Sequence, residues 1–148
     1  MMLSLLGRSL VGAAIAVCVV SSVSAKGQTR RLTVTGPTVQ GPLEVTDPIA
    51  LASVWGGEFI GASASEPNPD WPRYVVSFHV QPPRTDAVKV MYVVHYARDP
   101  QSGEGFVYLP GPGQEWYRLN ASTILRSGDG RWHRAAVPWS RAINARLP

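Results

Sequence analysis

Two alternating stretches at the centre of the chain decide the fold: YVVSFHV at residues 74–80 and KVMYVVHYA at residues 89–97. In each stretch every second residue is apolar, which is the period of a β-strand whose side chains point alternately to opposite faces. The intervening positions of the second stretch are largely apolar too, so we expect it to be a central strand covered on both faces. The loop at 81–88 allows the two strands to pair as an antiparallel hairpin.

Shorter strand-like runs lie on either side of this hairpin, separated by turns rich in glycine and proline. Residues 31–35 and 43–46 precede the hairpin, and residues 105–109, 115–119 and 131–135 follow it. Pairs such as Gly36-Pro37 and Gly41-Pro42 supply the turn chemistry. The pattern predicts an antiparallel meander of about five strands.

Two helices are predicted at the flanks of the sheet. Asp47-Pro48 combines a capping residue with proline at the first helical position, and Gly56-Gly57 ends this short segment. Residues 138–147 place apolar side chains at helical spacing. We therefore predict an α+β domain in which a short N-terminal helix and a C-terminal helix pack on the sheet.

The first 25 residues have the composition of a signal peptide. Seventeen of them are apolar, Arg8 is their only charged residue, and Val23-Ser24-Ala25 fits the small-residue pattern for cleavage between Ala25 and Lys26. The apolar run of about 11 residues is shorter than the roughly 20 needed to cross a bilayer. We expect a secreted, periplasmic or envelope-associated domain over residues 26–148, with no stable membrane span after cleavage. Lipidation at Cys18 is disfavoured, because Val17 stands where a small residue is required.

Removal of the leader would also remove the only cysteine, Cys18. A mature chain without cysteine has no disulfide framework, no thiol nucleophile and no cysteine-based zinc site. The sequence also lacks the Gly-x-Ser-x-Gly elbow, the His-Glu-x-x-His helix and the phosphate-binding glycine loop. We therefore expect no metal or cofactor, and enzymatic activity is not favoured.

Charge is concentrated at the C-terminal end of the chain. The formal net charge is +4, and residues 118–148 hold six arginines against a single acid, Asp129. A basic region suits an anionic partner. Because export separates the protein from nucleic acid, we expect an anionic polysaccharide, or a cell-wall or envelope component, rather than nucleic acid.

Four segments resemble those of a group of small secreted bacterial proteins without assigned function. They are WGGEF at 55–59, YVVHYARDP at 92–100, GFVYLP at 105–110 and WYRLN at 116–120. The resemblance extends over roughly residues 35 to 139. It is a general likeness of the whole domain and includes no catalytic signature. It implies export and one compact domain, and it supplies no active residue.

Four residues are candidates for ligand binding. Trp116 and Arg118 fall on one face of the strand expected at 115–119, where an indole and a guanidinium can stack on a sugar and clamp a carboxylate. Arg131 and His133 share a face of the strand expected at 131–135.

Two other polar features, a pair of histidines and a glycosylation pattern, are not counted among the candidate sites. The register set by the hairpin keeps His79 and His95 several residues apart, which argues against a shared metal. Asn120-Ala121-Ser122 matches a glycosylation acceptor, a pattern that is common by chance.

The favoured hypothesis is an exported, monomeric, non-enzymatic module that binds an anionic partner through Trp116, Arg118, Arg131 and His133. One alternative is a small secreted hydrolase without a recognisable motif, in which carboxylates and a histidine converge in one pocket. Another is a structural or stress protein with no ligand.

Overall fold

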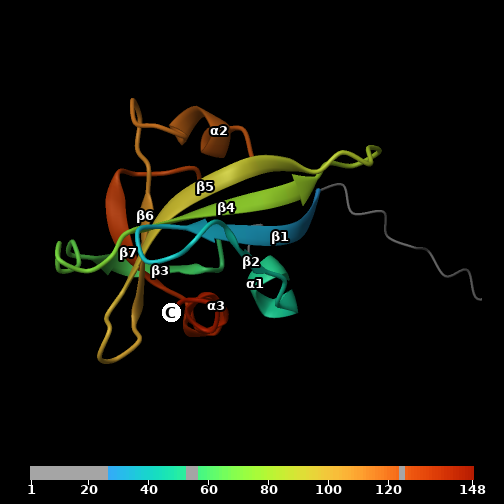
Figure 1. Cartoon of the computed structure of the whole chain (residues 1–148). Coiled ribbons are helices and arrows are strands. Elements are labelled where there is room, and N and C mark those ends of the chain that lie inside the picture. The colour runs from blue at the N-terminus through green and yellow to red at the C-terminus, as the bar shows by residue number, and fades with distance from the viewer. Residues whose placement is uncertain (1–26, 53–56, 124–125) are drawn as a thin grey trace, which may run out of the picture.

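The computed structural model describes residues 27–52, 57–123 and 126–148. Over these ranges the chain forms a seven-stranded sheet and three short helices (Figure 1). The strands are β1 (Gln28–Thr35), β2 (Leu43–Val45), β3 (Ile60–Ala64), β4 (Tyr74–Gln81), β5 (Lys89–Arg98), β6 (Gly105–Leu109) and β7 (Arg131–Ala135), and the helices are α1 (Pro48–Ala52), α2 (Tyr117–Ala121) and α3 (Val137–Asn144). Every strand pairing is antiparallel. The α+β class is confirmed, and the sheet is wider than the five strands expected.

The hairpin of β4 and β5 forms the middle of the sheet, as its alternation predicts. The strand order is β2-β1-β4-β5-β6-β7-β3, which places β5 at the centre. Val75 pairs with His95, whereas His79 pairs with Val90. The two histidines are therefore several residues apart along the hairpin, as the register from the sequence predicts.

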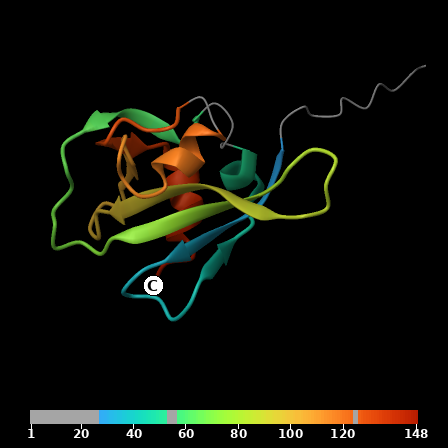
Figure 2. The same ribbon diagram turned by 90° about the horizontal axis from the view of Figure 1, so that it is seen from above.

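The hydrophobic core lies between one face of the sheet and the helices α1 and α3 (Figure 2). We call this the inner face, and the opposite side the outer face. Trp139 of α3 is fully buried and lies against Phe59, Phe78 and Tyr96, with ring centroids 5.0, 6.2 and 5.8 Å away. Burial of a large side chain of this kind contributes about 1.5–3 kcal/mol, so these contacts fix α3 against the sheet.

Among the strands, β3 is the one that the sequence pattern does not predict. It pairs with β7 at one edge of the sheet, with a register irregularity between Ile60 and Ser63. Its sequence, IGASA, has no alternation of large apolar residues. Backbone pairing with β7, rather than apolar burial of its own side chains, accounts for most of its placement.

The strand expected at residues 115–119 is wrong, because this segment turns into helix α2. Trp116 precedes the helix with φ 65° and ψ −6°, a left-handed conformation that ends any extended run. The buried Asn120 side chain instead makes the hydrogen bonds to the β5 backbone that a neighbouring strand would make. Its Oδ1 accepts from the Val93 amide at 2.9 Å and its Nδ2 donates to the Val93 carbonyl at 2.8 Å.

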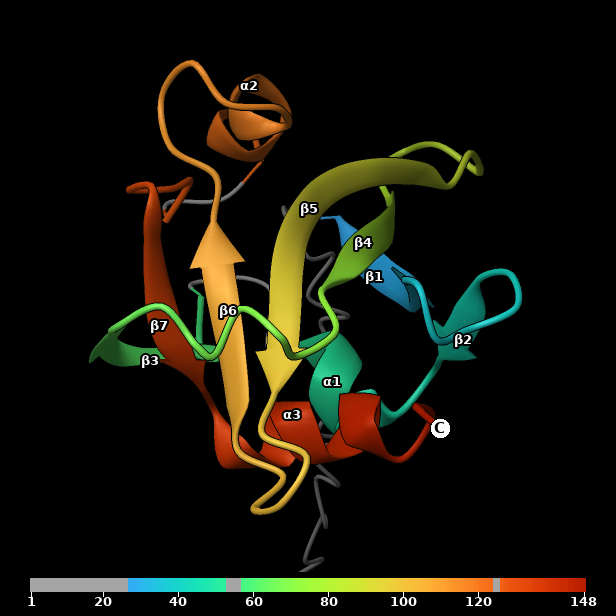
Figure 3. The same cartoon turned by 60° about the vertical axis from the view of Figure 1, so that its left-hand side comes forward.

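Helix α2 thus lies beyond the end of β6 and beside β5, on the opposite side of the molecule from α3 (Figure 1, Figure 3). Thr123, which follows α2, donates from its hydroxyl to the Met91 carbonyl at 2.5 Å. The part of β5 that β6 does not reach is therefore satisfied by side chains instead of a neighbouring strand.

None of the helices within the described ranges has the length and apolar character that a membrane crossing requires. The expected leader and its cleavage site at Ala25 and Lys26 lie outside the described residues.

Candidate functional site

The structure brings two of the four predicted ligand-binding residues together. Trp116 and Arg118 line an open depression of about 660 Å³, formed by residues 113, 114 and 116–119. The two side chains share it because the chain turns at Trp116 into the first turn of α2, and not because they alternate along a strand. Arg118 is exposed and has no hydrogen-bond or ion-pair partner among the described residues.

Arg131 and His133 lie on the other side of β7. Alternation along the strand turns both toward the inner face, where His133 opposes Val107, and turns Trp132 toward the outer face, where it opposes Tyr108. Arg131 is exposed at the strand end, whereas His133 is only 1% exposed. The structure therefore does not place these two beside Trp116.

His133 is engaged inside the protein. Its Nε2 lies 2.9 Å from Oδ2 and 3.1 Å from Oδ1 of Asp129, and the Asp129 carboxylate also accepts from the Arg131 amide at 3.1 Å. Within the described ranges its buried Nδ1 has no partner. A ring that is enclosed in this way cannot touch a ligand on the surface, so the candidate site excludes it.

The outer face carries a row of four aromatic rings, which we call the aromatic strip: Trp116, His95, Tyr108 and Trp132. The centroids of successive rings are 5.3, 5.8 and 5.3 Å apart. Strand pairing produces the row, because Tyr108 of β6 lies opposite both His95 of β5 and Trp132 of β7. All four side chains are half-buried, so part of each ring remains accessible.

The segment between β3 and β4 frames one end of the strip, and Figure 3 shows it crossing the outer side of the sheet. The Arg73 guanidinium lies over the Trp132 ring, 5.0 Å from its centroid, and donates to the carbonyls of Pro67 and Asn68 at 2.9 and 3.2 Å. Trp71 contacts Phe106 with centroids 6.2 Å apart. One cation thus fixes this segment to the sheet and lies at the end of the strip.

His95 provides polar atoms in the middle of the strip. Burial lowers the pKa of His95 below its usual 6.5, and the nearby Glu115 carboxylate partly offsets this effect. The ring is therefore neutral at pH 7, with one nitrogen that donates and one that accepts. Neither nitrogen has a hydrogen-bond partner within the described part of the chain.

Tyr108 and Trp116 are held in place by the turn before α2. The Gln114 side-chain oxygen accepts from the Tyr108 hydroxyl at 2.8 Å and from the Gly111 amide at 2.6 Å. Trp116 adopts its left-handed conformation, which costs a bulky residue about 1–3 kcal/mol. The surrounding contacts offset this strain and keep the indole on the imidazole of His95.

The glycosylation pattern at Asn120 is not accessible in the folded protein. The Asn120 side chain is fully buried, and its amide nitrogen and oxygen both bond the backbone of Val93.

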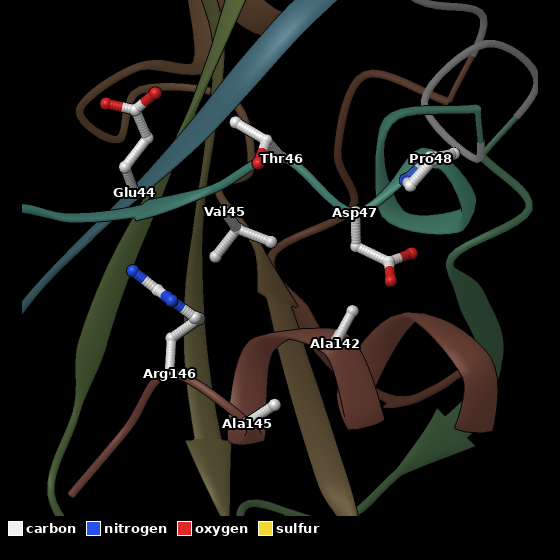
Figure 4. Close-up of a pocket in the computed structure, with 8 residues that line it drawn as sticks. All are labelled: Glu44, Val45, Thr46, Asp47, Pro48, Ala142, Ala145 and Arg146. Carbon is white, nitrogen blue, oxygen red and sulfur yellow. The ribbon is translucent and has the colours of Figure 1, made fainter.

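A second depression, of about 560 Å³, lies between the β2–α1 connection and α3 (Figure 4). Its charged lining residues are Glu44, Asp47 and Arg146. Asp47 caps α1 by accepting from the amides of Ile49 and Ala50, and Figure 4 shows Glu44 pointing away from α3. No histidine lines this depression, so it lacks the convergence of carboxylates and histidine that the hydrolase alternative requires.

Among the residues that the structure describes, no cluster of three or more histidine, cysteine, aspartate or glutamate side chains is arranged to hold a metal ion. Comparisons of the chain with protein-family models, with curated proteins and with solved structures find no match.

Proposed function

We propose that the protein is an exported, non-enzymatic binding module that holds an anionic polysaccharide of the cell envelope at Trp116 and Arg118. The observation that carries the proposal is the depression in which an accessible indole and an unpaired guanidinium lie together. A sugar ring can stack on the indole, and a carboxylate on the same sugar can accept from the guanidinium. The apolar leader at residues 1–25 supports export and therefore a partner in the envelope.

The state of Arg118 distinguishes it from Arg73 and Arg134, the two other arginines nearest the aromatic strip. Arg73 is bonded to backbone carbonyls and lies 3.7 Å from Glu66, and Arg134 is paired with Glu104. Arg118 has no such partner among the described residues, so its five donors are open to a ligand. A carboxylate that binds there does not have to displace an internal partner.

Affinity electrophoresis with polygalacturonate, alginate and hyaluronan tests the proposal, with methyl-esterified polygalacturonate as the uncharged comparison. We expect retardation by at least one of the anionic polymers and weaker retardation by the ester. Arg118→Ala should weaken binding by about tenfold or more, because it removes a hydrogen bond to a charged group.

Arg131→Ala is the matched control, because it removes the same charge from the opposite side of the sheet. It should leave binding unchanged. Absence of binding to all three anionic polymers, or equal losses in the two variants, would contradict the proposed function.

A further inference from the structure

Resting on the proposed function, we infer that the binding site continues along the aromatic strip and takes an acidic polysaccharide chain lengthwise across β5, β6 and β7. The alternative occupant is a single acidic sugar confined to the depression at α2. The strip defines a direction, because its rings follow one another from Trp116 to Trp132 without interruption.

The length of the strip exceeds one sugar ring. From His95 on β5 to Trp132 on β7 it crosses two strand spacings, roughly 10 Å. Trp116 extends it further at the α2 end. A chain of several sugars is therefore needed to cover all four rings.

The strip also has the mixed character that sugar chains require. Their faces are apolar and stack on aromatic rings, while their edges carry hydroxyl groups. His95 presents ring nitrogens that the described residues leave without partners, and they can bond such hydroxyls. A purely apolar occupant would leave these nitrogens unsatisfied.

Cations mark both ends of the strip. Arg118 lines the depression at one end, and the Arg73 guanidinium covers the Trp132 ring at the other. A carboxylate on a sugar of the chain can bond Arg118 directly, and a carboxylate further along the chain gains only the longer-range attraction of Arg73, whose donors are bonded to the Pro67 and Asn68 carbonyls. A neutral chain would gain the stacking contacts alone.

Calorimetric titration with fragments of one to six sugars, prepared from the tightest-binding polymer above, tests this inference. We expect affinity to rise with length until the fragment spans the strip and then to level off. Trp132→Ala should lower affinity for the longest fragments by about tenfold and leave that for the single sugar unchanged. Trp132→Phe should recover most of the loss, because it restores a ring, and the thermal unfolding of both variants checks that they are folded.

The outcomes separate this inference from the proposed function. If the single sugar binds as tightly as the hexamer, or if Trp132→Ala leaves the length dependence intact, the extended site is overturned while binding at Trp116 and Arg118 stands. If no polymer binds, both fail.

Discussion

His133 and Trp132 are sequence neighbours, yet they have opposite roles because they point to opposite faces of β7. Trp132 is half-buried on the outer face, and His133 is enclosed on the inner face with one acid, Asp129, as its partner. Asp129→Ala would leave Nε2 without this partner in addition to the unpartnered Nδ1. We expect it to lower the free energy of unfolding by about 1–3 kcal/mol, measured by urea denaturation.

Asp86→Ala is the control for this prediction, since Asp86 is an exposed acid in the β4–β5 hairpin. It should change stability by no more than about 0.5 kcal/mol. Equal stability of the two variants would mean that the Asp129 contact contributes little.

The pKa of His95 makes stability depend on pH in a defined direction. Because burial lowers this pKa below 6.5 in the folded protein, the unfolded chain binds a proton at a higher pH than the folded chain does. The stability that comes from the neutral ring is complete above about pH 6.5 and is lost as the pH falls toward the lower folded pKa. His79, whose pKa burial and Arg31 also lower, acts in the same direction.

Urea unfolding at several pH values between about 7.5 and 5 tests this linkage. We expect the wild-type protein to lose stability across this range. His95→Gln should lose less, and a double variant with His79→Gln less again. Parallel losses in all three proteins would refute the assignment.

The residues of the site were only partly accessible to sequence reasoning. Trp116 and Arg118 were predicted to act together, and they do line one depression, although through a turn instead of a strand. His95, Tyr108 and Trp132 were not predicted as a group. Alternation indicates the face of each ring within its own strand, but their contact requires the order and register of β5, β6 and β7, which local patterns do not determine.

The side chain of Asn120 ties α2 to the sheet. Asn120 satisfies both backbone groups of Val93 where β6 has ended. Asn120→Ala would leave a buried amide and a buried carbonyl without partners, and we expect a loss of at least about 2 kcal/mol in the free energy of unfolding. The Val93 amide should also exchange its hydrogen faster, which NMR hydrogen exchange measures at that position.

Asn120→Asp and Ser122→Ala sharpen this test. Aspartate can still accept from the Val93 amide but cannot donate to its carbonyl, so an intermediate effect is expected. Ser122 is exposed and bonds only the Leu119 carbonyl of its own helix, so its replacement should have little effect. Unchanged exchange at Val93 in Asn120→Ala would show that α2 is held by other contacts.

The strongly patterned elements were predictable and the others were not. Strands β6 and β7 have the boundaries that the sequence predicts, and β4 and β5 differ from them by a single residue at one end. Strand β3 escaped prediction because its small residues carry no period. The strand predicted at residues 115–119 was wrong, because the alternation of these residues is typical of a strand. The left-handed backbone at Trp116 and the tertiary hydrogen bonds of Asn120 favour a helix instead.

The whole molecule is asymmetric about its sheet. The inner face is buried by α1 and α3, whereas the outer face carries the aromatic strip between α2 and the segment that contains Arg73 (Figure 3). The basic residues of the C-terminal end do not gather on one surface, because Arg131 and Arg134 lie on opposite sides of β7 and Arg141 is on α3. The proposed site therefore depends on local geometry at the outer face and not on the net charge of +4.

The most direct test of binding at the outer face is an NMR titration of the isotope-labelled protein with fragments of the anionic polymer that binds best. We expect the indole signal of Trp116 and the backbone signals around Arg118 to shift first, with His95 and Tyr108 following as the fragment lengthens. The signals of α3 on the inner face should stay in place. Shifts that concentrate on α1 and α3, or the absence of any shift at saturating fragment, would contradict binding at the outer face.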